Sequence, residues 1–344
     1  MASTYNTFIE SEDVPVVATF AIPDLAELEV APWERIGGEG CYVHLDGRGP
    51  SNAFISQIAP GHELKEQRHF FEESVFVVNG SGRTEMWNDA GFTTAFNWEK
   101  GAVFAIPLNV HYRHINQSTS EPARLFSITN EPLMMNLTPD PELVFNLDHD
   151  FEDRFNPAIT DFTKPVQIGE DAPRNARTGV RWFHGNVIPS AYDVSLPSRP
   201  ERGAGGNNLH FDLAGTTLGI HISEFPPKTY KKAHRHGPGA HVVLLSGTGY
   251  SLLWKADEEP IRVDWKPGAV LVPPDRYFHQ HFNVGDDQAR YLALRFGGGG
   301  LGLGGGEGGN ASISTREGGD QIEYDDEDPR IRGWFEQSIS GTAG

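Results

Sequence analysis

The chain has 344 residues, of which 38% are hydrophobic and 22% charged, and its formal net charge is -19. This length allows two domains with a core each, and the acidic balance without a basic stripe excludes nucleic acid as an expected partner. The sequence contains no run of about 18 apolar residues, so we expect no transmembrane helix. Its first residues lack the pattern of a secretory signal. Because the single cysteine, Cys41, rules out an intrachain disulfide, we expect a cytoplasmic protein.

The first third of the chain predicts an arm followed by short strands. Residues 1–35 mix short apolar runs with Pro and Glu and are expected to pack on the body as an arm. From 36 to 135, alternating segments at 40–45, 53–58 and 75–78 predict strands, and Gly, Pro and Asn mark the turns between them. Many short strands without helical periodicity favour a sandwich or barrel over a Rossmann-type sheet.

Residues 136–206 predict a linker, because they are rich in Pro, Asp, Asn and Arg. Within this linker, 141–147 predicts a short helix and 199–206 an exposed loop. Residues 207–296 return to short strands. Residues 297–309 are nearly all glycine and predict a tether without a fixed conformation, and the remainder to 344 carries a helix.

The segment after the tether predicts an amphipathic helix. Asp328 suits its N-cap and Pro329 its first helical position. Its apolar face consists of Ile331, Trp334, Phe335 and Ile339. Because this face is unfavourable in water, we expect the helix to dock on a barrel of its own chain or of a partner subunit. We favour the partner, within a homo-oligomer.

An internal repeat determines the architecture. A shift of 167 positions places residues 54–116 on 221–283 without a gap. The matched pairs include Gly80 and Gly247, Trp87 and Trp254, Trp98 and Trp265, Gly101 and Gly268, Pro107 and Pro274, and Asn116 and Asn283. Because the tryptophans recur in both copies, we interpret them as packing residues. The sequence therefore predicts two similar β-domains in tandem.

The two copies differ at positions that can hold a metal. The second copy has His234, His236 and His279 where the first has Gln67, His69 and Tyr112. Residues at i and i+2 lie on the same side of a strand, so the first two histidines face one way, and the third comes from a later strand. Three imidazoles placed in this way can hold a metal and leave coordination positions open. The sequence predicts one mononuclear site, in the second copy.

This spacing resembles the two motifs of the cupin superfamily, a His-x-His pair followed by Glu and Gly, and a Gly-Pro-His-Asn series. The second copy matches with His234, His236 and Gly247, then Gly268, Pro274, His279 and Asn283. The resemblance covers most of both copies and implies a bicupin, with two jelly-roll β-barrels and a metal at the barrel centre. The expected fold is all-β, with two such barrels joined by a helical linker and followed by a tail helix.

Two positions depart from the motif. Ala240 stands where the family has a glutamate ligand, and Arg276 replaces the motif glycine. His241 follows Ala240 and should point to the opposite side of the strand, unless a bulge after residues 237–239 turns it inward. His241 is therefore a candidate fourth ligand, with packing or support of the ligands as the alternative.

A three-histidine centre without a carboxylate, with the tail His279-Gln280-His281-Phe282-Asn283, resembles the gentisate 1,2-dioxygenase group of bicupins. This resemblance implies Fe(II), dioxygen and cleavage of a C–C bond in a chelating aromatic acid or dicarbonyl substrate. In that group, however, the working site lies in the N-terminal cupin. Imidazole suits other divalent metals equally, so a redox-neutral isomerase, lyase or decarboxylase with Mn, Ni or Zn is the alternative. A bicupin that binds a small ligand without turnover is the third hypothesis.

Other residues of the second unit are candidates for roles around the metal. Gln280 and His281 can orient His279 or bound dioxygen. If His221 faces the lumen, it can line the pocket or act as an acid–base group, and core packing is the alternative. Candidates for holding a substrate carboxylate are Arg235, Arg290 and Arg295, each with a structural salt bridge as the alternative.

The first unit retains only part of the motif. His69 and Glu73 occupy two ligand positions, whereas Gln67 and Tyr112 occupy the other two. Two ligands bind a metal weakly, and a phenol near its usual pKa is a poor ligand. We interpret this barrel as one that has lost its metal and serves packing and assembly.

Overall fold

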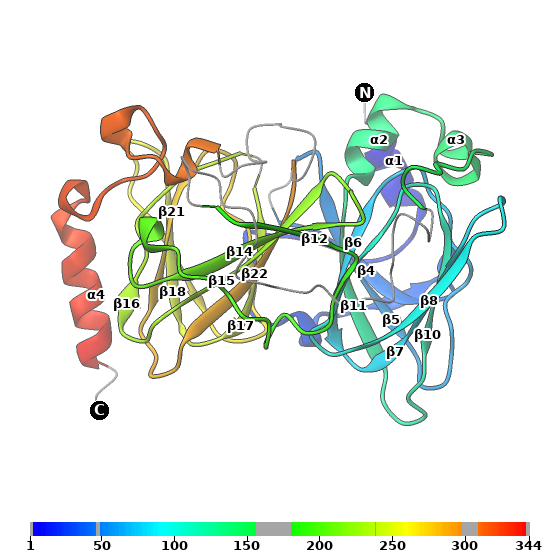
Figure 1. The fold of residues 1–344 in the computed structure, drawn as a ribbon, viewed down its shortest axis with the longest axis horizontal. Coiled ribbons are helices and arrows are strands. Elements are labelled where there is room, and N and C mark those ends of the chain that lie inside the picture. The colour runs from blue at the N-terminus through cyan, green and yellow to red at the C-terminus, as the bar shows by residue number, and fades with distance from the viewer. Residues whose placement is uncertain (1–2, 46–48, 156–179, 238, 298–308, 342–344) are drawn as a thin grey trace.

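The computed structural model describes residues 3–45, 49–155, 180–237, 239–297 and 309–341. Figure 1 shows two β-barrels side by side, the first blue to cyan and the second green to orange, with helix α4 (Pro329–Gly341) on the outer side of the second. The predicted all-β fold with tandem barrels is confirmed. No helix among these residues is long and apolar enough to cross a membrane.

The first barrel consists of a large sheet and a small sheet. The large sheet has the order β1 (Val16–Ala18), β4 (Gly38–His44), β5 (Asn52–Ile58), β11 (Ala123–Thr129), β6 (Glu73–Asn79), β9 (Val103–Ile106) and β13 (Val187–Ile188), with β3 (Ala31–Trp33) paired to β4. The small sheet has the order β10 (His111–Asn116), β7 (Ser81–Trp87) and β8 (Thr93–Glu99). The predicted strands at 40–45, 53–58 and 75–78 correspond to β4, β5 and β6.

The second barrel repeats this plan. Its large sheet has the order β12 (Trp182–Gly185), β14 (Asn207–Leu213), β15 (Leu218–Phe225), β22 (Ala289–Phe296), β17 (His241–Ser246), β20 (Val270–Leu271) and β2 (Ala21–Ile22). Its small sheet has the order β16 (Thr229–Tyr230), β21 (Phe278–Asn283), β18 (Gly249–Trp254) and β19 (Ile261–Trp265). The metal-site candidates lie on and beside the small sheet.

The two barrels exchange edge strands. From the N-terminal arm, Ala21 and Ile22 pair with β20 of the second barrel. From the linker, Val187 and Ile188 pair with β9 of the first barrel. The arm also contributes β1 and β3 to the first barrel. The arm and the linker are therefore parts of the sheets, rather than segments packed on their outside.

The large sheets of the two barrels share one hydrophobic core. This core joins Val75 and Val77 of β6 to Val243 of β17 and to Leu292 and Leu294 of β22. Because successive side chains of a strand alternate between faces, their neighbours on β17 and β22 must point the other way, into the second barrel. A separate cluster inside that barrel indeed contains Val242, Leu244, Tyr291 and Ala293.

The repeated glycines have a structural cause. Gly80 and Gly247 have φ of +87° and +79°, a region that favours glycine. An added Cβ would lie 2.7 Å from the Cα of Ala123 in the first barrel and 2.7 Å from the Cα of Ala289 in the second. The same close approach of two strands therefore requires glycine in both copies.

Helices are few and short. The α-helices besides α4 are α1 (Thr4–Ser11), α2 (Glu131–Leu137) and α3 (Pro141–Asn146). The 3-10 turns are η1 (Leu25–Glu27), η2 (Pro200–Arg202), η4 (Gly309–Ser312), η5 (Thr315–Glu317) and η6 (Tyr324–Asp326). The predicted helix at 141–147 is confirmed, and the Asp140 side chain caps it. The predicted tether falls largely outside the described residues.

Helix α4 packs on the second barrel of its own chain. Ile331 and Phe335 are buried against Tyr250 and Phe282 of the small sheet. The ring of Phe335 lies 4.9 Å from that of Tyr230. Trp334 and Ile339 lie at the margin of the same cluster. The predicted apolar face is confirmed, and here it packs on the second barrel of its own chain. Docking on a partner subunit stays a prediction.

Candidate metal centre

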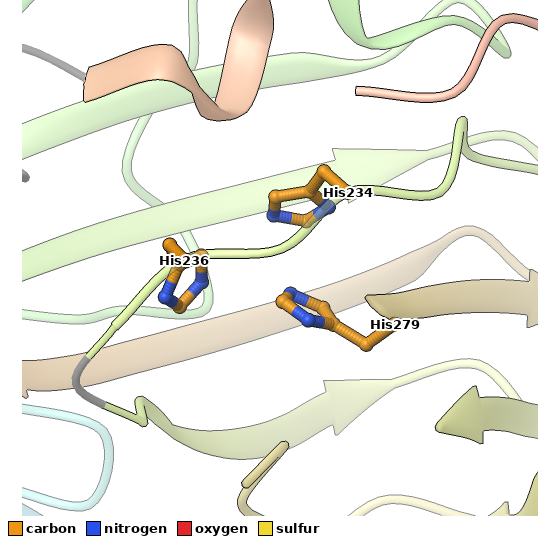
Figure 2. Close-up of side chains that lie close together, drawn as sticks. All are labelled: His234, His236 and His279. Carbon is orange, nitrogen blue, oxygen red and sulfur yellow. The ribbon is translucent and has the colours of Figure 1, made fainter. Parts of the chain in front are cut away.

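Three histidines of the second barrel lie close together, as Figure 2 shows. His234 and His236 lie on the extended segment that follows β16, and His279 lies on β21. The backbones of His234 and His279 are joined by two hydrogen bonds of 2.8 and 3.0 Å. This bridge places their side chains next to each other, and the i, i+2 spacing brings the third ring to the same side.

The three rings surround a common point. Their centroids are 4.1 to 5.4 Å apart, and no pair is stacked. One nitrogen of each ring lies within 4.8 Å of the others. Two rings are buried and that of His236 is half-buried. The residues that the sequence analysis proposed as ligands are thus brought together by the fold.

The protonation of these histidines suits a metal. Burial lowers the pKa of His279 to about 3, and burial, with the nearby Arg202, lowers the pKa of His234 well below its usual value. Both rings are therefore neutral at physiological pH. Nδ1 of His279 lies 3.3 Å from the carbonyl of Tyr277 and can donate to it, which leaves the Nε2 lone pair available. The donor set fits a divalent transition metal.

A buried arginine contacts the cluster. Nη2 of Arg202 lies 2.5 Å from Nδ1 of His234, and Nη1 donates to Oε1 of Gln321 and to the carbonyl of Ala311. Arg202 is only 6% exposed. Arg199 is equally buried, and it bonds to Asn208 and Ser312. The prediction of an exposed loop at 199–206 is wrong, because the C-terminal segment covers this turn.

His281 belongs to a hydrogen-bond chain that occurs in both barrels. In the second barrel, Nε1 of Trp265 donates to Oγ of Ser251 at 3.0 Å, and this hydroxyl lies 2.7 Å from Nδ1 of His281. The hydroxyl accepts from the indole and can donate its own proton to Nδ1 of the imidazole, and the proton of His281 then lies on Nε2. The first barrel has the same chain of Trp98, Thr84 and His114.

The histidine pair His210 and His221 lies in the same barrel. Their rings stack at 4.8 Å, and Tyr291 meets His221 edge-on at 6.0 Å. Burial lowers the pKa of both rings well below the usual value. Nδ1 of His221 has no hydrogen-bond partner among the described residues. His221 therefore faces the interior, as required for the pocket-lining role that the sequence analysis considered.

Two other candidates, His241 and Gln280, point away from the cluster. His241 lies on the face of β17 that meets the first barrel, with its ring 6.2 Å from that of Phe126, so it is not grouped with the three histidines. Its neighbour Pro238, at the proposed bulge, lies outside the described residues. Gln280 lies on the opposite side of β21 from His279 and bonds to Glu327 and to the carbonyl of Lys231. It therefore cannot orient a ligand of the metal.

Two of the proposed carboxylate-binding arginines are held by the protein itself. Arg235 pairs with Asp320 at 2.7 Å. Arg290 pairs with Glu224 at 2.7 Å and donates to the carbonyls of Ala191 and Val194, which ties the linker to the barrel. Arg295 is buried on the interior face of β22, and burial lowers its pKa to about 10. Only this third arginine faces the barrel interior.

The sequence analysis missed several polar residues of this interior. They are Arg199, Arg202, Lys231, Tyr291 and Gln321. None belongs to a repeated motif, and Arg202 and Gln321 come from segments far from the histidines in sequence. The pair Arg199 and Arg202, close together in the sequence, is a signal that could have drawn attention to this turn.

In the first barrel, the equivalent side chains bond to one another. The Tyr112 hydroxyl donates to Glu73 at 2.8 Å and lies 3.0 Å from Nε2 of His69. His69 also contacts Glu73 at 3.3 Å, while Gln67 bonds to Arg35. A cavity of about 20 Å³ lies beside them, room for little more than one water molecule. Tyr112 thus completes an internal network at the position of the third histidine.

No protein-family model and no curated protein sequence matches the chain. Among solved structures, it is similar to oxalate decarboxylase from Bacillus subtilis at pH 4.6, with 14% identity, a TM-score of 0.53 and coverage of 82% of this chain and 76% of that one. A single-residue variant of the same enzyme gives the same identity and TM-score, with 78% of its chain covered. At this identity the likeness concerns the fold, which is that of a bicupin.

Proposed function

We propose that this chain is a metalloenzyme with one divalent ion on His234, His236 and His279, acting on a small organic acid. The observation that carries the proposal is the cluster of three histidines beside buried cationic groups. Among the described residues it is the one group of three or more His, Cys, Asp or Glu that could hold a metal. The first barrel, where Tyr112 bonds to Glu73 and His69, offers no second cluster of this kind.

The residues around the cluster favour an anionic substrate. Arg202 and Arg295 are buried in the barrel, and a guanidinium fork matches a carboxylate. His281, with its proton on Nε2, can donate to an oxyanion. When bound, the metal supplies Lewis-acid stabilisation of negative charge on a chelating oxygen. Such an environment stabilises the charge that develops when a C–C bond next to a carboxylate breaks, without any oxidant.

Redox-neutral decarboxylation is therefore the reaction that we place first. The structurally similar Bacillus subtilis enzyme is an oxalate decarboxylase, described as having Mn(II) centres. Mn(II) is accordingly the first metal to test, with Ni, Zn and Fe(II) as alternatives, because imidazole ligands suit all of them.

An Fe(II)-dependent dioxygenase is the second candidate, and one observation favours it. Ala240 stands in place of the carboxylate ligand, so the donor set is entirely neutral and the ion keeps its full charge. Cleavage of a chelating aromatic acid or dicarbonyl would then consume dioxygen.

Product formation with and without oxygen separates the two reactions. The protein would be purified anaerobically, analysed for metals, loaded with Mn(II) or Fe(II), and supplied with dicarboxylates and hydroxylated aromatic acids. We expect carbon dioxide release at an undiminished rate under argon. Product formation that consumes oxygen stoichiometrically and stops under argon would favour the dioxygenase instead. Metal binding without turnover of any acid would favour a binding protein.

A further inference from the structure

Lys231 is a fully buried cation inside the second barrel. It is 1% exposed, and its backbone N–H donates to the carbonyl of His281. Its ammonium donates to the hydroxyls of Ser223 at 2.8 Å and Tyr291 at 3.3 Å. An ammonium has three N–H donors, and both of these partners are hydroxyl groups rather than carboxylates.

The charge of Lys231 is not balanced by a carboxylate among the described residues. Burial lowers the pKa of Lys231, the cations Arg202 and Arg199 lower it further, and the oxygen of Tyr291 raises it. The carboxylate that raises the pKa of the neighbouring Arg202 is that of Glu323, and this carboxylate already pairs with Lys232 at 2.5 Å. Burying a cation without a counter-charge costs several kcal/mol. An anion that binds next to such a group supplies the missing counter-charge and lowers the free energy of the folded protein.

The lysine is close to the three-histidine cluster. The ring of His281 lies 5.7 Å from that of His279, and the ring of Tyr291 lies 5.2 Å from that of His281. The ammonium of Lys231 lies 5.0 Å from the Tyr291 ring centroid. These contacts connect the histidine cluster to the lysine through His281 and Tyr291.

We propose that Lys231, Ser223 and Tyr291 form a second anion-binding subsite, which holds a carboxylate of the substrate lying outside the group that chelates the metal. This inference rests on the proposed function and adds the substrate class. The substrate is a diacid longer than oxalate, with one acid group at the histidine cluster and the other at Lys231.

The test compares diacids with their half esters. Wild-type protein loaded with Mn(II) would be titrated calorimetrically with malonate, succinate, glutarate and phthalate, and with the monomethyl ester of each. The test variant is Lys231→Met, which keeps the volume and removes the charge. The matched control is Lys228→Met, because Lys228 is a half-exposed lysine nearby that pairs with Asp286.

We expect at least one diacid to bind the wild type and the control roughly ten-fold more tightly than its half ester, the value of one charge-assisted hydrogen bond. In Lys231→Met this ratio should fall to near one, with metal content unchanged. The subsite is refuted if the wild type binds every diacid and half ester equally, or if Lys231→Met keeps the ratio. If the wild type does not bind Mn(II), this result would instead refute the proposed function.

Thermal stability provides a measurement independent of activity. Without added anion, Lys231→Met should melt at the same or a higher temperature than the wild type, because an uncompensated buried charge has been removed. The diacid should raise the melting temperature of the wild type and of Lys228→Met more than that of Lys231→Met. If inorganic phosphate does this as well as the diacid while diacid and half ester bind equally, the site takes a free anion and the substrate assignment fails. A tyrosinate ultraviolet band from Tyr291 in the anion-free protein would show an internal counter-charge and also overturn it.

Discussion

The guanidinium of Arg202 donates a hydrogen bond from Nη2 to Nδ1 of His234. A neutral imidazole that accepts at one nitrogen carries its proton on the other. In this state the only free lone pair of the His234 ring is on Nδ1, and the guanidinium of Arg202 is hydrogen-bonded to it. A metal that binds His234 must either displace Arg202 or move the proton to Nδ1, which would release the guanidinium for a substrate.

The first prediction concerns Arg202. We expect Arg202→Met to bind Mn(II) several-fold more tightly, because a competing cation is removed, and to bind a carboxylate substrate at least ten-fold more weakly. Isothermal titration with metal and then with ligand measures both. Arg262→Met, which removes an exposed arginine paired with Asp264, is the control. Weaker metal binding by Arg202→Met would mean that the arginine supports the histidine instead of competing with the metal.

The second prediction tests the single metal site. His234→Ala, His236→Ala and His279→Ala should each lose most of the bound metal, since two imidazoles bind a divalent ion weakly. His69→Ala should keep it, because His69 bonds to Glu73 and Tyr112 in the first barrel. Elemental analysis after Mn(II) loading gives the answer. Two metals per chain, or full loading of any of the first three variants, would contradict the prediction.

The third prediction is a pH dependence of stability that arises from Glu131. Burial raises the pKa of this carboxyl from 4.5 to about 7, against the opposing effect of Arg35. One oxygen accepts from Asn52 at 2.8 Å, and the other has no partner among the described residues. Arg35 forms its ion pair with Glu12 and not with Glu131. The buried Glu131 carboxyl therefore has no ion-pair partner in Arg35 and favours its protonated form.

Between pH 4.5 and about 7 the folded state keeps a proton at Glu131 that the unfolded state has lost. The contribution of Glu131 to the free energy of unfolding is therefore full below pH 4.5 and falls as the pH rises, by on the order of 3 kcal/mol. Glu131→Gln should remove this slope in urea unfolding at the two ends of the window. The control Glu142→Gln, on the exposed part of α3, should retain the pH dependence. If the free energy of unfolding of the wild type and of Glu131→Gln changes equally with pH, the prediction is wrong.

The fourth prediction concerns the tail. Truncation after Gly309 should lower the melting temperature and the activity, because the removed segment covers the barrel and supplies Gln321 to Arg202. Phe335→Ala should cost about 3 kcal/mol, the usual effect of emptying a buried aromatic position. Arg332→Ala, exposed on the same helix, should be nearly neutral. A melting temperature that depends on protein concentration only when Phe335 is present would indicate docking on a partner subunit.

Local periodicity predicted much of the fold. The strands at 40–45, 53–58 and 75–78, the helix at 141–147 and the apolar face of α4 follow from residue patterns within a few positions, and the structure contains all of them. The repeat predicted the two barrels, because equal spacing of glycines reflects equal strand crossings. Strand alternation also predicted that His241 faces away from the metal. The same rule places Gln280 opposite His279, so its proposed role was already in conflict with the sequence.

The tertiary structure alone decided what surrounds the metal position. Arg202 is 32 positions from His234 in sequence, and Gln321 is 119 positions from Arg202. Lys231 meets Tyr291 across 60 positions. Contacts of this range depend on how sheets curve and how the C-terminal segment folds back, and no short spacing encodes them. The sequence thus determined which residues can bind a metal, whereas the packing of distant segments determined that buried cations lie beside it.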